Sequence, residues 1–476
     1  MTPPITAVLL ARNAARNFLG IGIPLLVALV SMPVLVGRLD TARFGVLGLV
    51  WVVFGLFAEL GLGRATTRFA ASALAAGSSG EARRIMRIGA GVQLGLGMLS
   101  GAALALAAPF VAARFGGGAG IEGELRAVLY VVAAGIPVVM MSAAYRGILE
   151  AAHRFDIVNR VRIPVASATY ALPAVVVVLG GGLVAIVLLL GVVRALGTAV
   201  YAWACVQVIG DGSARAPADG PGVVDILKFG AWQTTGGVLA PLLVYLDRFL
   251  LGALAGVAAV GLYTPAFEVA LRLLILPVSV VMALFPAFSA WSASLERERA
   301  ARAAARAVLY IVAGIAPLAA ILAILGEDGL RVWLNAEYAR ETGMVLTVLS
   351  FGVLLNGTAF VPATLLAGAG RPDIPPKLYL LELPAYVVLA TVFITHWGLV
   401  GAALAWTCRV AADALLLFVA THRLALLRWQ DLWRMWVPQT LAGVCACLMA
   451  PAAAAAAVPG LWPRIGLAMV ALTATL

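Results

Sequence analysis

The sequence has little charge and few of the residues that build soluble active sites. Only 12% of its 476 residues are charged, and it contains four cysteines and three histidines. The cysteines lie within or beside apolar runs and have no metal-ligand spacing with the scattered histidines, so neither a disulfide framework nor a metal centre is expected. No phosphate-binding loop of the Gly-x-x-x-x-Gly-Lys-Ser/Thr type occurs. We therefore expect no ATP hydrolysis by this chain and no cofactor.

The chain also lacks room for a catalytic domain outside its apolar runs. The longest segments predicted on the external side are residues 115–124 and 326–342, which are short for an active-site platform. This disfavours a membrane glycosyltransferase or polymerase and predicts that the protein is not an enzyme. The N-terminus carries a basic flank and about 20 apolar residues without a small-residue cleavage site, so we expect a retained first helix and not a removed signal peptide.

Apolar residues dominate what is present. They make up 63% of the chain, with a mean hydropathy of +1.04, far above the roughly 45–50% apolar share of soluble proteins. A helix that crosses the hydrocarbon core needs about 20 such residues. Fourteen runs of roughly this kind occur, twelve of them clear, at 17–36, 44–63, 88–113, 125–148, 163–179, 183–205, 229–251, 260–288, 308–325, 344–367, 378–395, 398–420, 437–458 and 465–476.

The two halves of the chain repeat one pattern. Residues 37–45 and 252–263 each close one apolar run, turn through a short loop and open the next, although the match needs a one-residue gap. Such an echo indicates two lobes facing each other, as in secondary transporters that alternate access to a central site. We predict an all-α membrane protein of 12–14 helices in two pseudo-symmetric six-helix lobes. Its parts are an N-terminal lobe (1–209), a cytoplasmic linker (210–228), a C-terminal lobe (229–420) and two additional helices (421–476).

Basic residues occur in bands between the apolar runs. The net charge of +11 would raise the question of nucleic acid in a soluble protein, but these bands suit a membrane protein and predict no nucleic-acid partner. Alternate loops hold 22 Lys and Arg on one side and eight on the other, which predicts that both termini are cytoplasmic. Residues 295–306, rich in Arg, Glu and Ala, read as a solvated helix, with contact to anionic lipid as the alternative.

Ionisable residues inside apolar runs are the candidate functional residues, because burying charge in a bilayer is costly. Glu268 and Arg272 are four residues apart in one run, and Arg409 and Asp413 are four apart in another. Each pair either neutralises itself and joins helices, or lines a polar cavity in which a guanidinium holds a phosphate. Arg194 has no acidic residue within one helical turn, so it calls for an anion from elsewhere.

Further charges fall at the ends of runs and are candidates for gates or edges. Asp247 and Arg248 lie near the end of the seventh run, where an interface cap is the simpler interpretation. Glu59 ends the second run, and Arg38 and Arg43 flank the turn before it. Prolines inside runs are expected to kink helices.

Four short stretches carry a resemblance to a known family. They are 245–267 (YLDRFLLGALAGVAAVGLYTPAF), 39–49 (LDTARFGVLGL), 59–63 (ELGLG) and 397–405 (WGLVGAALA). The first looks like the turn between the seventh and eighth helices of the bacterial polysaccharide flippases, which belong to the multidrug/oligosaccharidyl-lipid/polysaccharide exporter superfamily, and the other three agree with this resemblance.

The resemblance implies a V-shaped bundle of two lobes in the inner membrane. It would flip an undecaprenyl-diphosphate-linked oligosaccharide from the cytoplasmic to the outer leaflet, with glycan polymerases or glycosyltransferases as partners besides membrane lipids. On this analogy Arg194, Arg272 and Arg409 are cavity cations, with Glu268 and Asp413 beside them. The alternative is a cation-coupled multidrug and toxin extrusion antiporter, which shares the fold but commonly carries an acidic residue in its first helix. Residues 17–36 contain none.

Overall fold

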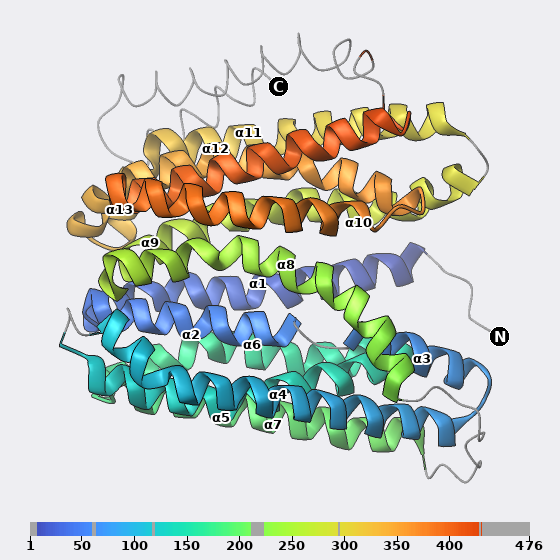
Figure 1. The fold of residues 1–476 in the computed structure, drawn as a ribbon, viewed down its shortest axis with the longest axis horizontal. Helices are drawn as coiled ribbons and strands as arrows, with labels where there is room; N and C mark the ends of the chain where they lie inside the picture. The colour runs from blue at the N-terminus through green and yellow to red at the C-terminus, as the bar shows by residue number, and fades with distance from the viewer. Residues whose placement is uncertain are drawn as a thin grey trace. The chain divides into compact units, whose positions relative to one another are not determined.

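The computed structural model describes residues 7–59, 63–116, 120–210, 223–293, 296–427 and 430. Within these residues the regular structure is helical and there is no strand, so the all-α expectation is confirmed. The chain forms two compact units, Met1–Pro241 and Leu242–Leu476, with the dividing point inside one helix, α8 (Val223–Ala255) (Figure 1). The predicted linker at 210–228 lies mostly outside the described residues, as do the last two predicted runs, 437–458 and 465–476.

The first unit contains all six predicted helices of the first lobe and one helix that hydropathy does not predict. The unpredicted helix is the short α3, which buries Thr66, Ala70 and Ala73 on one face and is too polar to register as a span. The elements that precede α8 are α1 (Ala7–Arg38), α2 (Thr41–Glu59), α3 (Gly63–Ala75), α4 (Ser79–Gly116), α5 (Glu122–Ala151), α6 (Phe155–Val178) and α7 (Leu183–Ile209).

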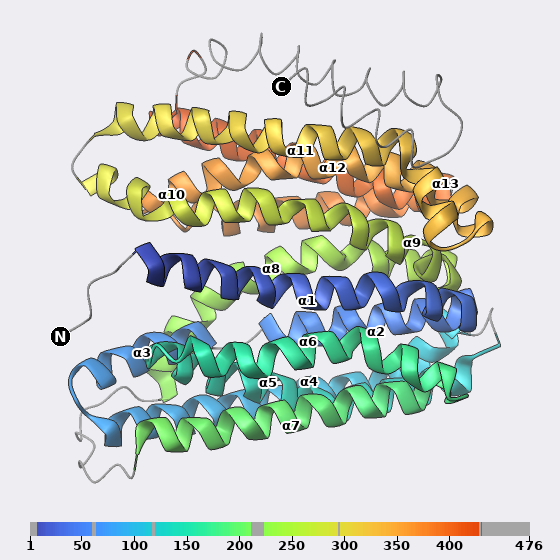
Figure 2. The same ribbon diagram turned by 180° about the vertical axis from the view of Figure 1, so that it is seen from behind.

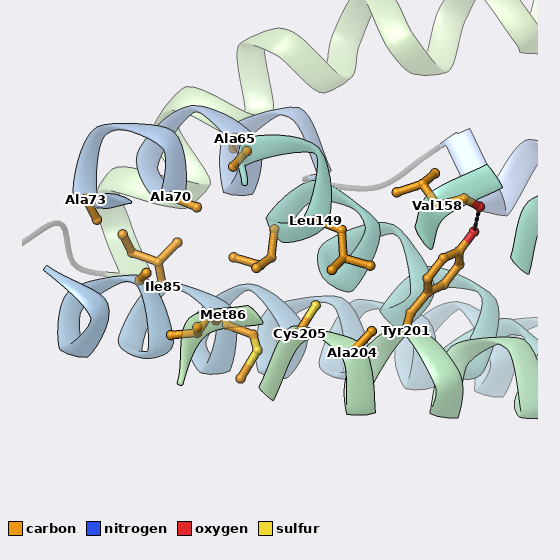
Figure 3. Packing of buried hydrophobic residues seen from close by; sticks show 14 residues of the cluster. Ala65, Ala70, Ala73, Ile85, Met86, Leu149, Val158, Tyr201, Ala204 and Cys205 are labelled. Atoms are coloured by element: carbon orange, nitrogen blue, oxygen red, sulfur yellow. Dashed lines mark hydrogen bonds between the residues drawn. The ribbon is translucent and has the colours of Figure 1, made fainter. Parts of the chain in front are cut away.

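Small residues let the long helices of the first unit approach closely. Helices α4, α5 and α7 lie side by side, seen from both directions in Figures 1 and 2. A Cβ on Gly97 would come within 2.5 Å of the Cα of Pro137 in α5, so this position in α4 admits only glycine at the observed spacing. One core cluster joins α3, α4, α5, α6 and α7, and six of its fourteen buried members are alanine (Figure 3). In it the Tyr201 hydroxyl donates to the Val158 carbonyl at 3.0 Å, which satisfies a buried polar group.

The second unit has α12 at its centre, because this helix packs against α9, α10, α11 and α13. Its predicted eighth span, 260–288, is not α-helical throughout, because a 3₁₀ turn at Arg272–Leu274 interrupts it. Pro277 lies three residues after this turn, and its ring and missing N–H disfavour α-helix there. The elements are the last part of α8, α9 (Val257–Leu271), η2 (Arg272–Leu274), α10 (Ile275–Ala293), α11 (Arg297–Trp333), α12 (Ala336–Gly368) and α13 (Ile374–Arg423).

The tight turns fall where the sequence predicts them. The echoed segments lie at the turns from α1 to α2 and from α8 to α9, where Gly256 has a φ of 85°. The eleventh and twelfth predicted runs form α13, which breaks at Gly398 with a φ of 55°. Left-handed backbone of this kind favours glycine.

Helices of membrane-spanning length and composition are numerous. Nine are long and apolar enough in the described part of the chain, and α1 adds a shorter apolar stretch, Gly22–Arg38. The protein is therefore a multi-pass membrane protein.

The turn between α12 and α13 carries an exposed ion-pair group. The Asp373 carboxylate accepts hydrogen bonds from Arg371 Nε at 3.0 Å and from Lys377 Nζ at 2.6 Å. These two cations hold the pKa of the Asp373 carboxyl well below its usual range. The group is exposed, so its contribution to stability is small.

Candidate functional site

A buried ionic cluster lies within the second unit and begins on α8. Asp247 has 0% and Arg248 1% of its surface exposed, although the sequence suggested an interface cap at this point. The Asp247 carboxylate accepts hydrogen bonds from the Tyr263 hydroxyl at 2.7 Å and from the Arg248 backbone N–H at 2.8 Å. The acid is thus held between α8 and α9, and each of its oxygens has a donor.

Glu268 of α9 bridges two arginines. Its Oε1 lies 3.1 Å from Arg248 Nη2, and its Oε2 lies 3.0 Å from Arg272 Nη2 at the start of η2. The Arg248 side chain is 1% exposed and that of Arg272 is 38% exposed, so one carboxylate joins a buried cation to an accessible one. The pair between Glu268 and Arg272, expected from their four-residue spacing, is present.

A second charged group of the same unit lies on α13. Arg409 has Glu382 Oε2 at 3.4 Å from its Nε and Asp413 Oδ2 at 3.7 Å from its Nη2. All three side chains are 7% exposed or less. Nη1 of Arg409, both oxygens of Glu382 and Oδ1 of Asp413 are buried without a hydrogen-bond partner. These charges neutralise one another by proximity more than by hydrogen bonding, which makes the group electrostatically costly.

Aromatic side chains connect the two groups. The Arg248 guanidinium carbon lies 4.4 Å from the centre of the Phe267 ring. That ring packs edge-on against Trp406 of α13 at 5.6 Å between centroids, and it lies 5.5 Å from Tyr263. A cation against the face of a desolvated ring is stabilised by the ring quadrupole. The contact therefore ties α8 and α9 to α13.

The combined cluster is close to electrically neutral when every group is ionised. It holds four acids and three arginines: Asp247, Glu268, Glu382, Asp413, Arg248, Arg272 and Arg409. Arg272 is the most accessible of its three cations, and its carboxylate partner is 21% exposed. Among the described residues, no set of three or more His, Cys, Asp and Glu side chains is arranged to hold a metal ion.

The first unit holds a different kind of cation. Arg194 lies on α7, twelve residues into a helix of 27, and its guanidinium carbon is 4.4 Å from the centre of the Phe54 ring of α2. Its nitrogens reach the Thr169 hydroxyl and the Leu190 carbonyl, both at 3.4 Å. Within the described ranges no carboxylate lies within 4 Å of it, so neutral groups surround this charge. Arg194 and the cluster of the second unit belong to separate units.

The edge candidates have varied surroundings. Arg38 ends α1 and is exposed. Arg43, at the start of α2, contacts Asp40 at 2.5 Å and Glu124 of α5 at 2.7 Å, which links two turns of the first unit. Glu59 is the last residue of α2, and its side chain lies outside the described residues.

Sequence reasoning missed one member of the cluster, Glu382, and one residue that donates a hydrogen bond to it, Tyr263. Glu382 lies inside the predicted run 378–395, so a search of that run for acids would have found it. Tyr263 carries no such signal, because a tyrosine in an apolar run is ordinary until its hydroxyl is seen to donate to a buried carboxylate.

Comparisons with known proteins agree with this architecture. A family model described as "Polysaccharide biosynthesis protein" matches residues 10–292. A curated protein of Shigella flexneri named "Putative O-antigen transporter" is 26% identical over 412 residues, covering 85% of this chain and 96% of that protein.

Two solved structures share the fold at low sequence identity. The lipid II flippase MurJ in an inward closed conformation gives a TM-score of 0.73 at 12% identity, covering 96% of this chain and 97% of that one. The inward-facing conformation of a multidrug resistance transporter of the MATE family, from the MOP superfamily, gives 0.68 at 16% identity and covers 88% and 99%. Because the family model matches more than half of the chain, the protein belongs to the polysaccharide biosynthesis protein family of membrane transporters.

Proposed function

We propose that this transporter flips an undecaprenyl-diphosphate-linked oligosaccharide from the cytoplasmic to the outer leaflet by alternating access of its two lobes. The family and the relative named as an O-antigen transporter support a polysaccharide-related cargo and a transporter in place of an enzyme. The fold shared with a lipid II flippase is consistent with a lipid-linked substrate. In this proposal the protein is in the inner membrane with both termini cytoplasmic, as the distribution of basic residues predicts.

The observation that carries the proposal is the uncompensated charge of Arg194. A guanidinium near the middle of a membrane helix, with an aromatic ring and neutral oxygens as partners, is costly unless an anion accompanies it. A diphosphate is a strong acceptor for the planar guanidinium fork, so it could supply that anion. A cargo without negative charge would leave Arg194 unexplained.

Arg272 supports the same chemistry by a different route. Its partner Glu268 also contacts Arg248, so the acid keeps one cation if Arg272 turns to another anion. We infer that the cargo diphosphate competes with Glu268 for Arg272. The exchange would cost little because it replaces one charge-assisted pair with another.

The test uses a host in which the gene is deleted. The inner-leaflet pool of lipid-linked oligosaccharide and the surface glycan are both quantified, with the chain or a variant supplied in trans. We expect wild type to restore surface glycan and Arg272→Gln or Arg194→Gln to lower the flipping rate by roughly 10–100-fold, the range expected for losing a charged hydrogen bond. Arg331→Gln, which removes an exposed arginine of α11, is the matched control and should behave as wild type.

The outcomes distinguish the alternatives, provided that immunoblots show equal amounts of the wild-type protein and of each variant in the membrane. Normal surface glycan in the deletion strain refutes the flippase proposal. If both variants restore surface glycan as well as wild type does, the proposed contact of the two arginines with the cargo is refuted. The proposed identity of the cargo is not.

A cation-coupled multidrug antiporter is the second candidate, and the excess of one acid in the second-unit cluster is the observation that favours it. An acidic lining suits cationic cargo. Increased sensitivity to cationic drugs in the deletion strain, with unchanged surface glycan, would promote this function.

A further inference from the structure

Helix α11 is much longer than a membrane requires. Its 37 residues span about 55 Å at 1.5 Å per residue, whereas a hydrocarbon core is about 30 Å thick. The first turns, from Arg297, are charged, and the apolar portion follows them. The N-terminal part of α11 therefore extends through the headgroup region of one leaflet.

One face of this extension is basic and then aromatic. Arg302, Arg306 and Tyr310 are each four residues apart, so they lie nearly in line on the helix, and all three are exposed, Tyr310 to 66%. We name these three residues the α11 basic stripe. The opposite face is buried alanine and valine, including Ala304, Ala305 and Val308. The stripe thus faces away from the protein while α11 itself is packed firmly.

The arginines of the stripe form no close ion pair with the described residues. Neither Arg302 nor Arg306 has a carboxylate within 4 Å in the part of the chain that the structure describes, and Glu298, one turn before Arg302, is also farther away than this. Arg299, one turn earlier, is different, because it pairs with Glu296 at 3.0 Å and lies 5.3 Å from the Trp291 ring. Two adjacent uncompensated guanidinium groups attract an anion, and a phosphate matches their geometry.

The level of the stripe matches a phospholipid headgroup. Exposed tyrosine marks the boundary between headgroups and hydrocarbon in membrane proteins. Arg306 is about 6 Å and Arg302 about 12 Å further along the axis than Tyr310, and side chains of a helix lean towards its N-terminus, here away from the hydrocarbon. Headgroup layers are about 5–8 Å thick, so Arg306 lies at phosphate level, and Arg302 lies a few Å outside the layer, from where a long arginine side chain can reach back to the phosphate.

The hydrocarbon side of the stripe suits an acyl chain. From Ile311 to Ala320 the exposed residues of α11 are Ala313, Gly314 and Leu318, and α10 beside it exposes Val278 and Leu276, whose side chain lies against Gly314. An apolar surface adjoining two cations is the profile of an anionic lipid.

We propose that the α11 basic stripe binds an anionic phospholipid, with the lipid phosphate between Arg302 and Arg306 and an acyl chain along α10 and α11. The site lies within the second unit and does not depend on the transported molecule. At this site, the lipids that surround the protein would be selected for negatively charged headgroups.

The test measures lipid binding to the purified, delipidated full-length protein by native mass spectrometry. Phosphatidylglycerol and phosphatidylcholine of equal chain length are titrated separately, and the affinity of the first bound lipid is compared. Wild type should prefer phosphatidylglycerol. Arg302→Gln and Arg306→Gln should each weaken it about fivefold, and the double variant about 30-fold, with phosphatidylcholine unchanged.

Two controls make the result decisive. Arg331→Gln removes an exposed arginine at the other end of α11 and should leave the preference intact. Inorganic phosphate at the same concentration should not displace the lipid. The proposal would be overturned by wild-type affinity in both single variants, by an equal loss of affinity in Arg331→Gln, or by full displacement of the lipid by phosphate. The single variants decide the result even if the double variant does not fold.

Discussion

The ion pair between Arg248 and Glu268 should stabilise the second unit far more than a surface pair of the same length. Arg248 is 1% exposed and Glu268 is 21% exposed, with 3.1 Å between Nη2 and Oε1. Removing one partner of a buried pair typically costs about 3–5 kcal/mol when it leaves an uncompensated charge. We expect Glu268→Gln to lower the free energy of unfolding by about that amount, and Arg248→Gln to lower it by less, because Glu268 keeps its contact with Arg272.

The chain supplies a matched comparison. Arg331 and Glu327 are 2.9 Å apart, but their side chains are 53% and 52% exposed. An exposed pair four residues apart on a helix is worth about 0.3–0.5 kcal/mol, because water screens the charges and the side chains lose freedom. The two pairs have similar distances, 3.1 and 2.9 Å, and differ most in burial, so comparing their coupling energies tests the effect of burial.

The assay is a double-mutant cycle on reversible unfolding in mixed micelles, followed by circular dichroism as the denaturing detergent fraction rises. The double variant Arg248→Gln/Glu268→Gln should lose at least about 2 kcal/mol less than the sum of the single variants. The cycle on Arg331 and Glu327 should give a coupling below about 0.5 kcal/mol. Equal coupling energies in the two cycles would refute the reasoning.

Three further predictions follow from single contacts. Gly97→Ala should cost about 1–3 kcal/mol because its Cβ meets the backbone of α5, whereas Gly95→Ala, with open space around it, should not destabilise; the same unfolding assay compares them. Tyr263→Phe should cost about 1–3 kcal/mol by leaving a buried Asp247 oxygen without its donor, and a cost below about 0.5 kcal/mol would contradict this. The pKa of the Asp373 carboxyl is lower in the folded protein than its unfolded value near 3.8. Its small contribution to stability should therefore be complete above pH 3.8 and be lost as the pH falls through the folded pKa. A carboxyl-carbon NMR titration, with Asp373→Asn as the reference, would show this.

The cluster of the second unit shows where prediction from the sequence stops. Glu268 and Arg272 could be paired in advance because four residues bring two side chains to one face of a helix. The contact between Glu268 and Arg248 could not, because they are 20 residues apart on two helices. The same holds for Arg409 and Glu382, whose contact depends on how the two halves of α13 fold back at Gly398.

The sequence by itself determined that this is an all-helical membrane protein, where its helices run and where its main turns fall. Runs of about 20 apolar residues and the glycines between them are local signals, and a bilayer makes them decisive because every backbone polar group must be paired inside a helix. Only the tertiary structure decided that α3 exists as a packed helix, that Asp247 and Arg248 are buried, and that Arg194 faces an aromatic ring and, among the described residues, no carboxylate within 4 Å. These features depend on which helix faces meet, and that choice rests on packing between residues far apart in the chain.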